Sequence, residues 1–225
     1  MVKKCIIFDN EDQSDEIVKL IRDGRNQGIA IECEQFNVGS TEYTEVLTNG
    51  EIDISKVISE YKRRFSGVTF HLAVFDWDLN DEKINGIELI RQLNSNRILH
   101  RTPKIVISAL LKSILADIVK SDEQKRIKQL TLLVNSNIIE YHEREKYEQD
   151  IINYFSKNEE SLDLILEEEF KKFPNHIFKN SFSNKNFNGK TFLEIAEFLE
   201  SDDKIRNDFK KELIHQVLAY LTEKI

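Results

Sequence analysis

The chain has 225 residues, of which 40% are hydrophobic and 32% are charged, and its formal net charge is −8. This length suggests one or two domains, and the excess of acids argues against nucleic acid as a partner, because phosphate binding needs clustered lysine and arginine. We find no apolar run long enough to span a membrane and no signal peptide, so no membrane association is expected.

Short apolar runs alternate with segments of helical periodicity over the first two thirds of the chain. The expected strands cover residues 5–8, 29–36, 72–75, 104–107 and 138–141. The expected helices begin near Ser14, near Asp53 or Ser55 and at Asn85-Gly86, and they cover most of 113–134 and 143–156. Because strands and helices alternate, we expect a parallel sheet with helices on both sides, and a polar insertion at about residues 37–51.

The two cysteines, Cys5 and Cys33, both fall in expected strands. Cysteines in such positions are usually reduced core residues, which suits the cytoplasm.

The strand pattern stops after residue 156, and the remaining chain is helical in character. Ser161 is placed to begin one helix, Thr191 and Glu194 fit a capping box for a second, and Ser201 precedes a third. We therefore expect an α/β domain over residues 1–156 and a small all-α module over 157–225. The phenylalanines of this module are expected either to pack within the chain or to form a surface that contacts a partner or a second copy. Phe182 and Phe187, which alternate with polar residues in the loop between these helices, are the candidates for such a surface.

Polar side chains gather at the carboxyl ends of three expected strands. Asp9 and Glu11 follow the first, Asp76 and Asp78 follow the third, and Ser108 ends the fourth. In a right-handed parallel sheet these ends meet in one crevice. Carboxylates placed together repel unless they are protonated or bound to a cation, and an all-oxygen cluster suits magnesium. A solvated acidic turn is the alternative interpretation.

Four segments together resemble the receiver domains of two-component response regulators over about residues 1–156. They read IIFDNED, VFDWDL, NGIELIRQL and IVISA, in the order and spacing of that family. The resemblance implies a flavodoxin-like, doubly wound, five-stranded parallel sheet. It also implies signal transduction with a histidine kinase, a phosphotransfer protein or an effector as partner, and a homodimer is an open possibility. Catalysis would be limited to self-phosphorylation from a phosphodonor.

The same resemblance assigns roles to individual residues. Asp76 would accept the phosphoryl group, and Ser108 would hydrogen-bond it. Asp9 and Asp76, with the main-chain carbonyl of Asp78, would hold Mg²⁺, and Tyr141 would be the aromatic residue that follows the switch.

The chain departs from the family pattern at two positions that matter for this chemistry. Asn10 replaces the usual second acid, for which Glu11 is a candidate substitute and therefore a metal ligand. No lysine stands at the end of the fifth strand, where His142 or Lys146 would have to substitute. These departures leave open a pseudo-receiver, in which the fold serves as a protein-binding platform without phosphorylation.

A third interpretation is a phosphatase similar to the haloacid dehalogenases. VFDWDL also resembles their DxD motif, in which Asp76 would be the nucleophile and Asp78 the general acid/base. In that family the motif lies on the first strand, and the later lysine and acidic pair are not evident here.

Overall fold

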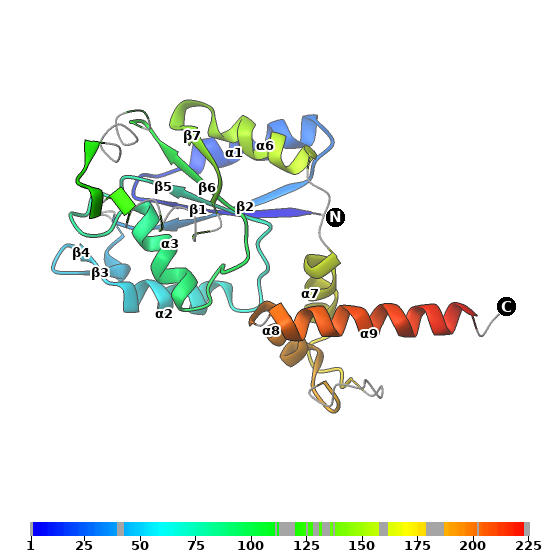
Figure 1. The fold of residues 1–225 in the computed structure, drawn as a ribbon. Coiled ribbons are helices and arrows are strands. Elements are labelled where there is room, and N and C mark those ends of the chain that lie inside the picture. The colour runs from blue at the N-terminus through cyan, green and yellow to red at the C-terminus, as the bar shows by residue number, and fades with distance from the viewer. Residues whose placement is uncertain are drawn as a thin grey trace. The chain divides into compact units, whose positions relative to one another are not determined.

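The computed structural model describes residues 2–39, 43–110, 112, 120–124, 126–127, 131, 136, 138–157, 162–178, 187–201 and 203–222. The chain divides into two compact units, Met1–Glu159 and Glu160–Ile225. The first unit is α/β and the second is all-α, as Figure 1 shows.

The first unit is built on a five-stranded parallel sheet. Its strands are β1 (Lys3–Asp9), β2 (Ile31–Asn37), β5 (Leu72–Asp76), β6 (Lys104–Ser108) and β7 (Ile138–Glu143). They lie in the order β2-β1-β5-β6-β7, and every pairing is parallel. This is the flavodoxin-like order, in which the direction of the connections reverses between the neighbouring strands β1 and β5. The expected fold class is therefore confirmed.

Helices cover both faces of this sheet (Figure 1). One face carries α1 (Ser14–Asn26) and α6 (Tyr147–Lys157), and the other carries α2 (Ile54–Phe65) and α3 (Gly86–Ser95). Alternate residues of each central strand serve the two faces, so β5 and β6 are buried along their whole length. An apolar core therefore lies on each face of the sheet, and together the two cores hold the ends of the central strands in position.

Two of the three helix caps expected in the first unit are confirmed. The Asp53 carboxylate accepts hydrogen bonds from the main-chain N–H groups of Ser55 and Lys56, and the Asn85 side chain accepts one from Glu88. Ser14 is instead the first residue of α1, and Gln13 occupies the cap position. The hydroxyl of Ser14 donates to the Asp12 carboxylate at 2.6 Å, and no side-chain hydrogen bond caps this helix at Gln13.

The expected polar insertion is partly core. It contains a turn of 3-10 helix, η1 (Thr44–Val46), and an antiparallel hairpin of β3 (Leu47–Thr48) and β4 (Glu51–Ile52). Val46, Leu47 and Ile52 are buried with the α2 and α3 core. Most of the helix expected at 113–134 lies outside the described residues.

The second unit has its own small core. Its helices are α7 (Leu162–Lys172), α8 (Phe192–Ser201) and α9 (Asp203–Thr222), and the capping box of α8 is formed as expected, since Glu194 accepts from the Thr191 N–H at 2.8 Å. Phe187 is fully buried and meets Phe209 edge-on, with ring centroids 4.9 Å apart.

The prediction that Phe187 belongs to an exposed contact surface is therefore wrong. A unit this small has few apolar side chains, so its core also takes a ring from a polar loop. Phe182 lies outside the described residues.

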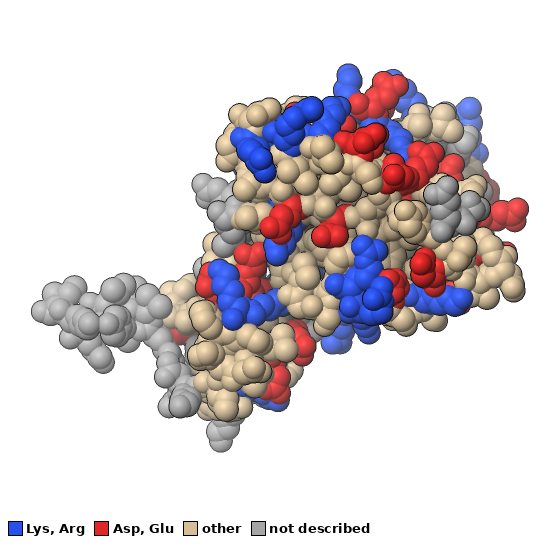
Figure 2. Space-filling model, turned by 180° about the vertical axis from the view of Figure 1, so that it is seen from behind, with Lys and Arg blue, Asp and Glu red and all other residues tan. Residues whose placement is uncertain are grey.

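Within the described part of the chain, no helix is long and apolar enough to cross a membrane. Basic and acidic side chains are intermixed over the face shown in Figure 2.

Candidate functional site

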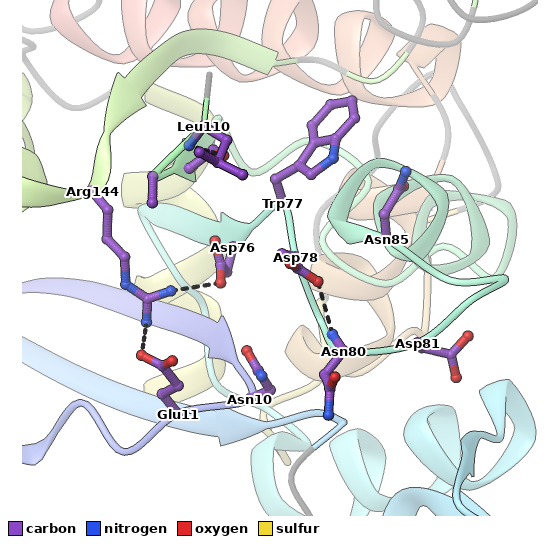
Figure 3. A pocket seen from close by; sticks show the side chains of 12 residues that line it. Asn10, Glu11, Asp76, Trp77, Asp78, Asn80, Asp81, Asn85, Leu110 and Arg144 are labelled. Atoms are coloured by element: carbon purple, nitrogen blue, oxygen red, sulfur yellow. Dashed lines mark hydrogen bonds and ion pairs between the residues drawn. The ribbon is translucent and has the colours of Figure 1, made fainter. Parts of the chain in front are cut away.

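Two acids end adjacent parallel strands and lie at the same edge of the sheet. Asp9 is the last residue of β1 and Asp76 the last of β5, and their side chains are 0% and 3% exposed. A pocket of about 690 Å³ opens above Asp76 (Figure 3). Its lining residues are Asn10, Glu11, Asp76, Trp77, Asp78, Asn80, Asp81, Asn85, Ser108, Ala109, Leu110 and Arg144. The crevice expected from the sequence is present.

A single guanidinium contacts three carboxylates at one side of the pocket, and Figure 3 shows its contacts with Asp76 and Glu11. Arg144 lies just after β7, in the 3-10 turn η2 (Arg144–Lys146). Its Nη1 is 2.7 Å from Asp76 Oδ2, and its Nη2 is 2.9 Å from both Asp9 Oδ2 and Glu11 Oε2. Arginine therefore supplies the positive charge that gathered carboxylates require.

Burial and mutual repulsion shift the titration of the two buried acids. The pKa of Asp76 is raised to about 6, mainly by burial and next by the charge of Asp9, against the opposing effect of Arg144. Burial also raises the pKa of Asp9, against the hydrogen bond from the Glu11 N–H and the charge of Arg144. Burial by itself would lower the pKa of Arg144, but its three carboxylate partners outweigh burial and raise it. The guanidinium thus stays charged.

Glu11 is held where it reaches the guanidinium. Its main-chain N–H donates to Asp9 Oδ1 at 2.8 Å, and its carbonyl accepts from Gln35 Nε2 at 2.6 Å. The side chain is 67% exposed. A carboxylate thus lies at the rim of the pocket next to Asn10, and the role of Glu11 as the substitute acid stays a prediction.

The loop between β5 and α3 forms a second wall. Asp78 is exposed, and its carboxylate accepts from the Asn80 N–H at 3.1 Å instead of facing Asp76. Asp81 accepts from the N–H groups of Ile52, Lys83 and Ile84 at 2.7–2.8 Å, which fastens this loop to the β3-β4 hairpin. The wall is therefore braced by the insertion.

Ser108 and Tyr141 differ in how close they come to Asp76. Ser108 is buried, lines the pocket and accepts a hydrogen bond from the Leu110 N–H at 3.0 Å. Tyr141 packs against the α2 and α3 core and is not a lining residue. Burial raises its pKa to about 12, and within the described residues its hydroxyl has no hydrogen-bond partner. Its role as an aromatic switch stays a prediction.

Arg144 is a site residue that the sequence motifs did not predict. His142 or Lys146 was expected in place of the family's lysine. The two ring nitrogens of His142 are instead each 2.8 Å from a carboxylate oxygen, one of Glu140 and one of Asp150. The available signal was that Arg144 is the first arginine or lysine after the fifth strand. The strand runs to Glu143, two residues beyond its expected end, and this extension places residue 144 at the acids.

The oxygen donors present at Asp9, Glu11 and Asp76 are of the kind that Mg²⁺ prefers. However, in the described part of the chain no group of three or more histidine, cysteine or acidic residues is arranged to hold a metal ion. Both carboxylate oxygens of Asp9 and one of Asp76 accept from Arg144 instead. Magnesium would therefore compete with the guanidinium, and the metal site stays a prediction.

Gly39 lies against the loop between β5 and α3, which is called the pocket loop below. A Cβ at this position would lie 2.0 Å from the main-chain oxygen of Leu79, and the residue has φ +83°. Gly50 has the same φ with nothing within 4 Å. We expect Gly39→Ala to reduce the free energy of unfolding by about 2 kcal/mol more than Gly50→Ala, because only Gly39→Ala adds a backbone clash to the conformational cost. Urea unfolding of both variants measures this, and equal losses would contradict the clash.

Solved structures similar to this chain are response-regulator proteins. The chemotaxis protein CheY4 of Vibrio cholerae is 8% identical, with a TM-score of 0.38, over 70% of this chain and 98% of that chain. A two-component response regulator from Legionella pneumophila is 12% identical, with a TM-score of 0.39, over 69% and 98%. The bacteriophytochrome response regulator RtBRR is 15% identical, with a TM-score of 0.40, over 72% and 82%.

This is the family that the sequence motifs resemble. At these identities the similarity concerns the fold alone, and the fold assignment rests on the strand order described above. No family model matches the chain, and no curated protein sequence matches it significantly.

Proposed function

We propose that the α/β unit is a divergent signalling receiver in which Asp76 accepts a phosphoryl group. The observation that carries this proposal is the contact between Arg144 and Asp76, at 2.7 Å in an open pocket. A carboxylate oxygen of Asp76 would attack the phosphorus of an acyl phosphate, and the bond from phosphorus to the acyl oxygen would break, releasing a carboxylate.

Arg144 supplies what the missing lysine would otherwise supply. Its guanidinium is always charged and presents donors in a fork that matches phosphoryl oxygens. Phosphorylation would replace the single charge of Asp76 by nearly two, and the guanidinium would hold the added charge, including the charge that develops during transfer. Ser108, in the same pocket, is the hydroxyl available to the phosphoryl group.

Magnesium belongs to the same proposal. Asp9, Glu11 and Asp76, with the main-chain carbonyl of Asp78, would hold it, and it would supply a second positive charge to the phosphoryl oxygens. The partners that fit this function are a histidine kinase or phosphotransfer protein as donor and an effector protein, or a second copy, as the reader of the state.

A pseudo-receiver is the second candidate. The hydrogen bonds of the buried acids favour it, because both oxygens of Asp9 and one oxygen of Asp76 already accept from Arg144. In that case the ion pairs hold the pocket in one state, and the domain acts through protein contacts alone.

Intact-mass spectrometry after incubation with acetyl phosphate and Mg²⁺ distinguishes the two. We expect one added phosphoryl group on the wild type, none on Asp76→Asn, and an unchanged gain on Asp78→Asn, because the Asp78 carboxylate faces Asn80. A chelator should reduce the wild-type gain if magnesium takes part.

Absence of any added group on the folded wild type would establish the pseudo-receiver. Phosphate release from simple phosphomonoesters that requires both Asp76 and Asp78 would indicate a phosphatase instead.

A further inference from the structure

The only two cysteines of the chain face each other across adjacent strands. Cys5 of β1 is the direct partner of Cys33 of β2 in the parallel register. Both side chains belong to the core beneath α1 and α6, and the two thiols are within hydrogen-bonding reach of each other. We propose that Cys5 and Cys33 form a peroxide-sensitive dithiol that closes to a disulfide between these strands.

The backbone geometry permits this bond. Neighbouring strands lie about 4.8 Å apart, and disulfides occur at Cα separations of about 4.4–6.8 Å. Residues that are direct partners in a parallel pair place their side chains on the same face. Closure therefore requires side-chain rotation with little movement of the strands.

The two thiols differ in their exposure to solvent, and this difference decides which of them reacts with an oxidant first. Cys5 is fully buried, while Cys33 is only half-buried and lies on β2, the edge strand of the sheet. Burial, and next the contact with Cys33, raises the pKa of the Cys5 thiol, so Cys5 is the slower nucleophile. Cys33 is therefore the thiol that meets an oxidant first, and Cys5 is the thiol that resolves the product.

The chemistry needs one oxidant, hydrogen peroxide. The Cys33 thiolate attacks one peroxide oxygen, an S–O bond forms, the O–O bond breaks, and the released hydroxide takes a proton to become water. Cys5 then attacks the sulfur of the resulting sulfenic acid, the S–S bond forms and a second water leaves. Two thiols are oxidised by two electrons in total, and one peroxide is reduced to two waters.

The test is intact-mass spectrometry of the full chain under denaturing, non-reducing conditions after graded hydrogen peroxide. We expect the wild type to lose the mass of two hydrogens and to regain it with a reductant. Cys5→Ser should stop at a sulfenic acid on Cys33 that dimedone traps, and Cys33→Ser should stay unmodified at the same peroxide dose.

A register control separates pairing from general reactivity. The double variant Cys33→Ser, Glu34→Cys moves the thiol one residue along the same strand, to the opposite face, where Glu34 is exposed. This variant keeps two thiols and a comparable or greater exposure, and we expect no internal disulfide.

Thermal unfolding gives a second readout, since the oxidised wild type should melt above the reduced protein. A wild type that is modified only to sulfenic or higher acids, that forms only intermolecular disulfides, or that resists peroxide until it unfolds would overturn the proposal. Formation of the internal disulfide by the register control would do the same.

Discussion

Replacing Arg144 with alanine is expected to lower the free energy of unfolding by about 3 kcal/mol at neutral pH, the scale typical of a buried ion pair that loses one partner. The change leaves Asp9 and Asp76 buried, close together and without a cation. Urea unfolding followed by circular dichroism measures the loss.

The loss of stability in Arg144→Ala should become smaller as the pH falls. The pKa of Asp76 in the folded protein is about 6, above the value of about 3.9 in an unfolded chain, so its ionised form costs stability above pH 6 and that cost is relieved as the pH falls. Without Arg144 the cost grows, because the guanidinium lowers this pKa. The deficit of the variant should therefore be smaller at about pH 5 than at about pH 7.5.

Arg63→Ala is the matched control. Arg63 forms an exposed pair with Glu60 within one helix, at 2.6 Å, and such pairs contribute only about 0.5 kcal/mol. An Arg144 deficit no larger than the Arg63 deficit, or one that is independent of pH, would show that the three contacts do not stabilise the pocket.

Lys104 is buried and is expected to make the free energy of unfolding depend strongly on pH. It begins β6, is 0% exposed, and its Nζ donates to the main-chain oxygens of Leu99 and Thr102 at 2.6 and 2.9 Å. Burial lowers its pKa to about 7. A neutral amine has two N–H groups, which match these two acceptors, so the uncharged form is well accommodated.

The direction follows from proton counting. Between about pH 7 and about pH 10 the unfolded chain keeps a proton on this lysine that the folded protein lacks, so Lys104 makes stability rise with pH. Over about two pH units this amounts to about 3 kcal/mol as an upper value. Other groups also titrate in this range, so the quantity to measure is the difference between wild type and Lys104→Met at about pH 7 and about pH 9.

We expect this difference to move in favour of the wild type as the pH rises. Lys62→Met, at an exposed position of α2, should show no such trend. A difference that does not change with pH would mean that Lys104 remains charged in the folded protein.

The fold could be predicted because its signals are local. The buried strand β5 begins with a continuous apolar run at residues 72–75, and caps such as Asp53 and Asn85 act on the next three residues. Once the elements and their alternation are known, few parallel topologies remain, and the meeting of Asp9 and Asp76 follows from them.

The rest of the site depends on distances that no local pattern encodes. Whether residue 142, 144 or 146 meets the acids is decided by where β7 ends, and β7 is a half-exposed edge strand with weak periodicity. The burial of Phe187 could not be predicted for a related reason. A ring in a polar loop is buried only when residues distant in the sequence, such as Phe209, form a core beside it.

The bonds of Asp81 have a consequence for how this chain can change in evolution. One carboxylate joins the pocket loop to Ile52, which lies 29 positions earlier in the sequence. A shorter insertion would remove one of three donors from this carboxylate, and a neutral residue at 81 would leave the exposed Lys83–Glu51 ion pair to join the hairpin to the loop. We therefore expect the insertion length and the acid at position 81 to be gained or lost together in descendants of this chain.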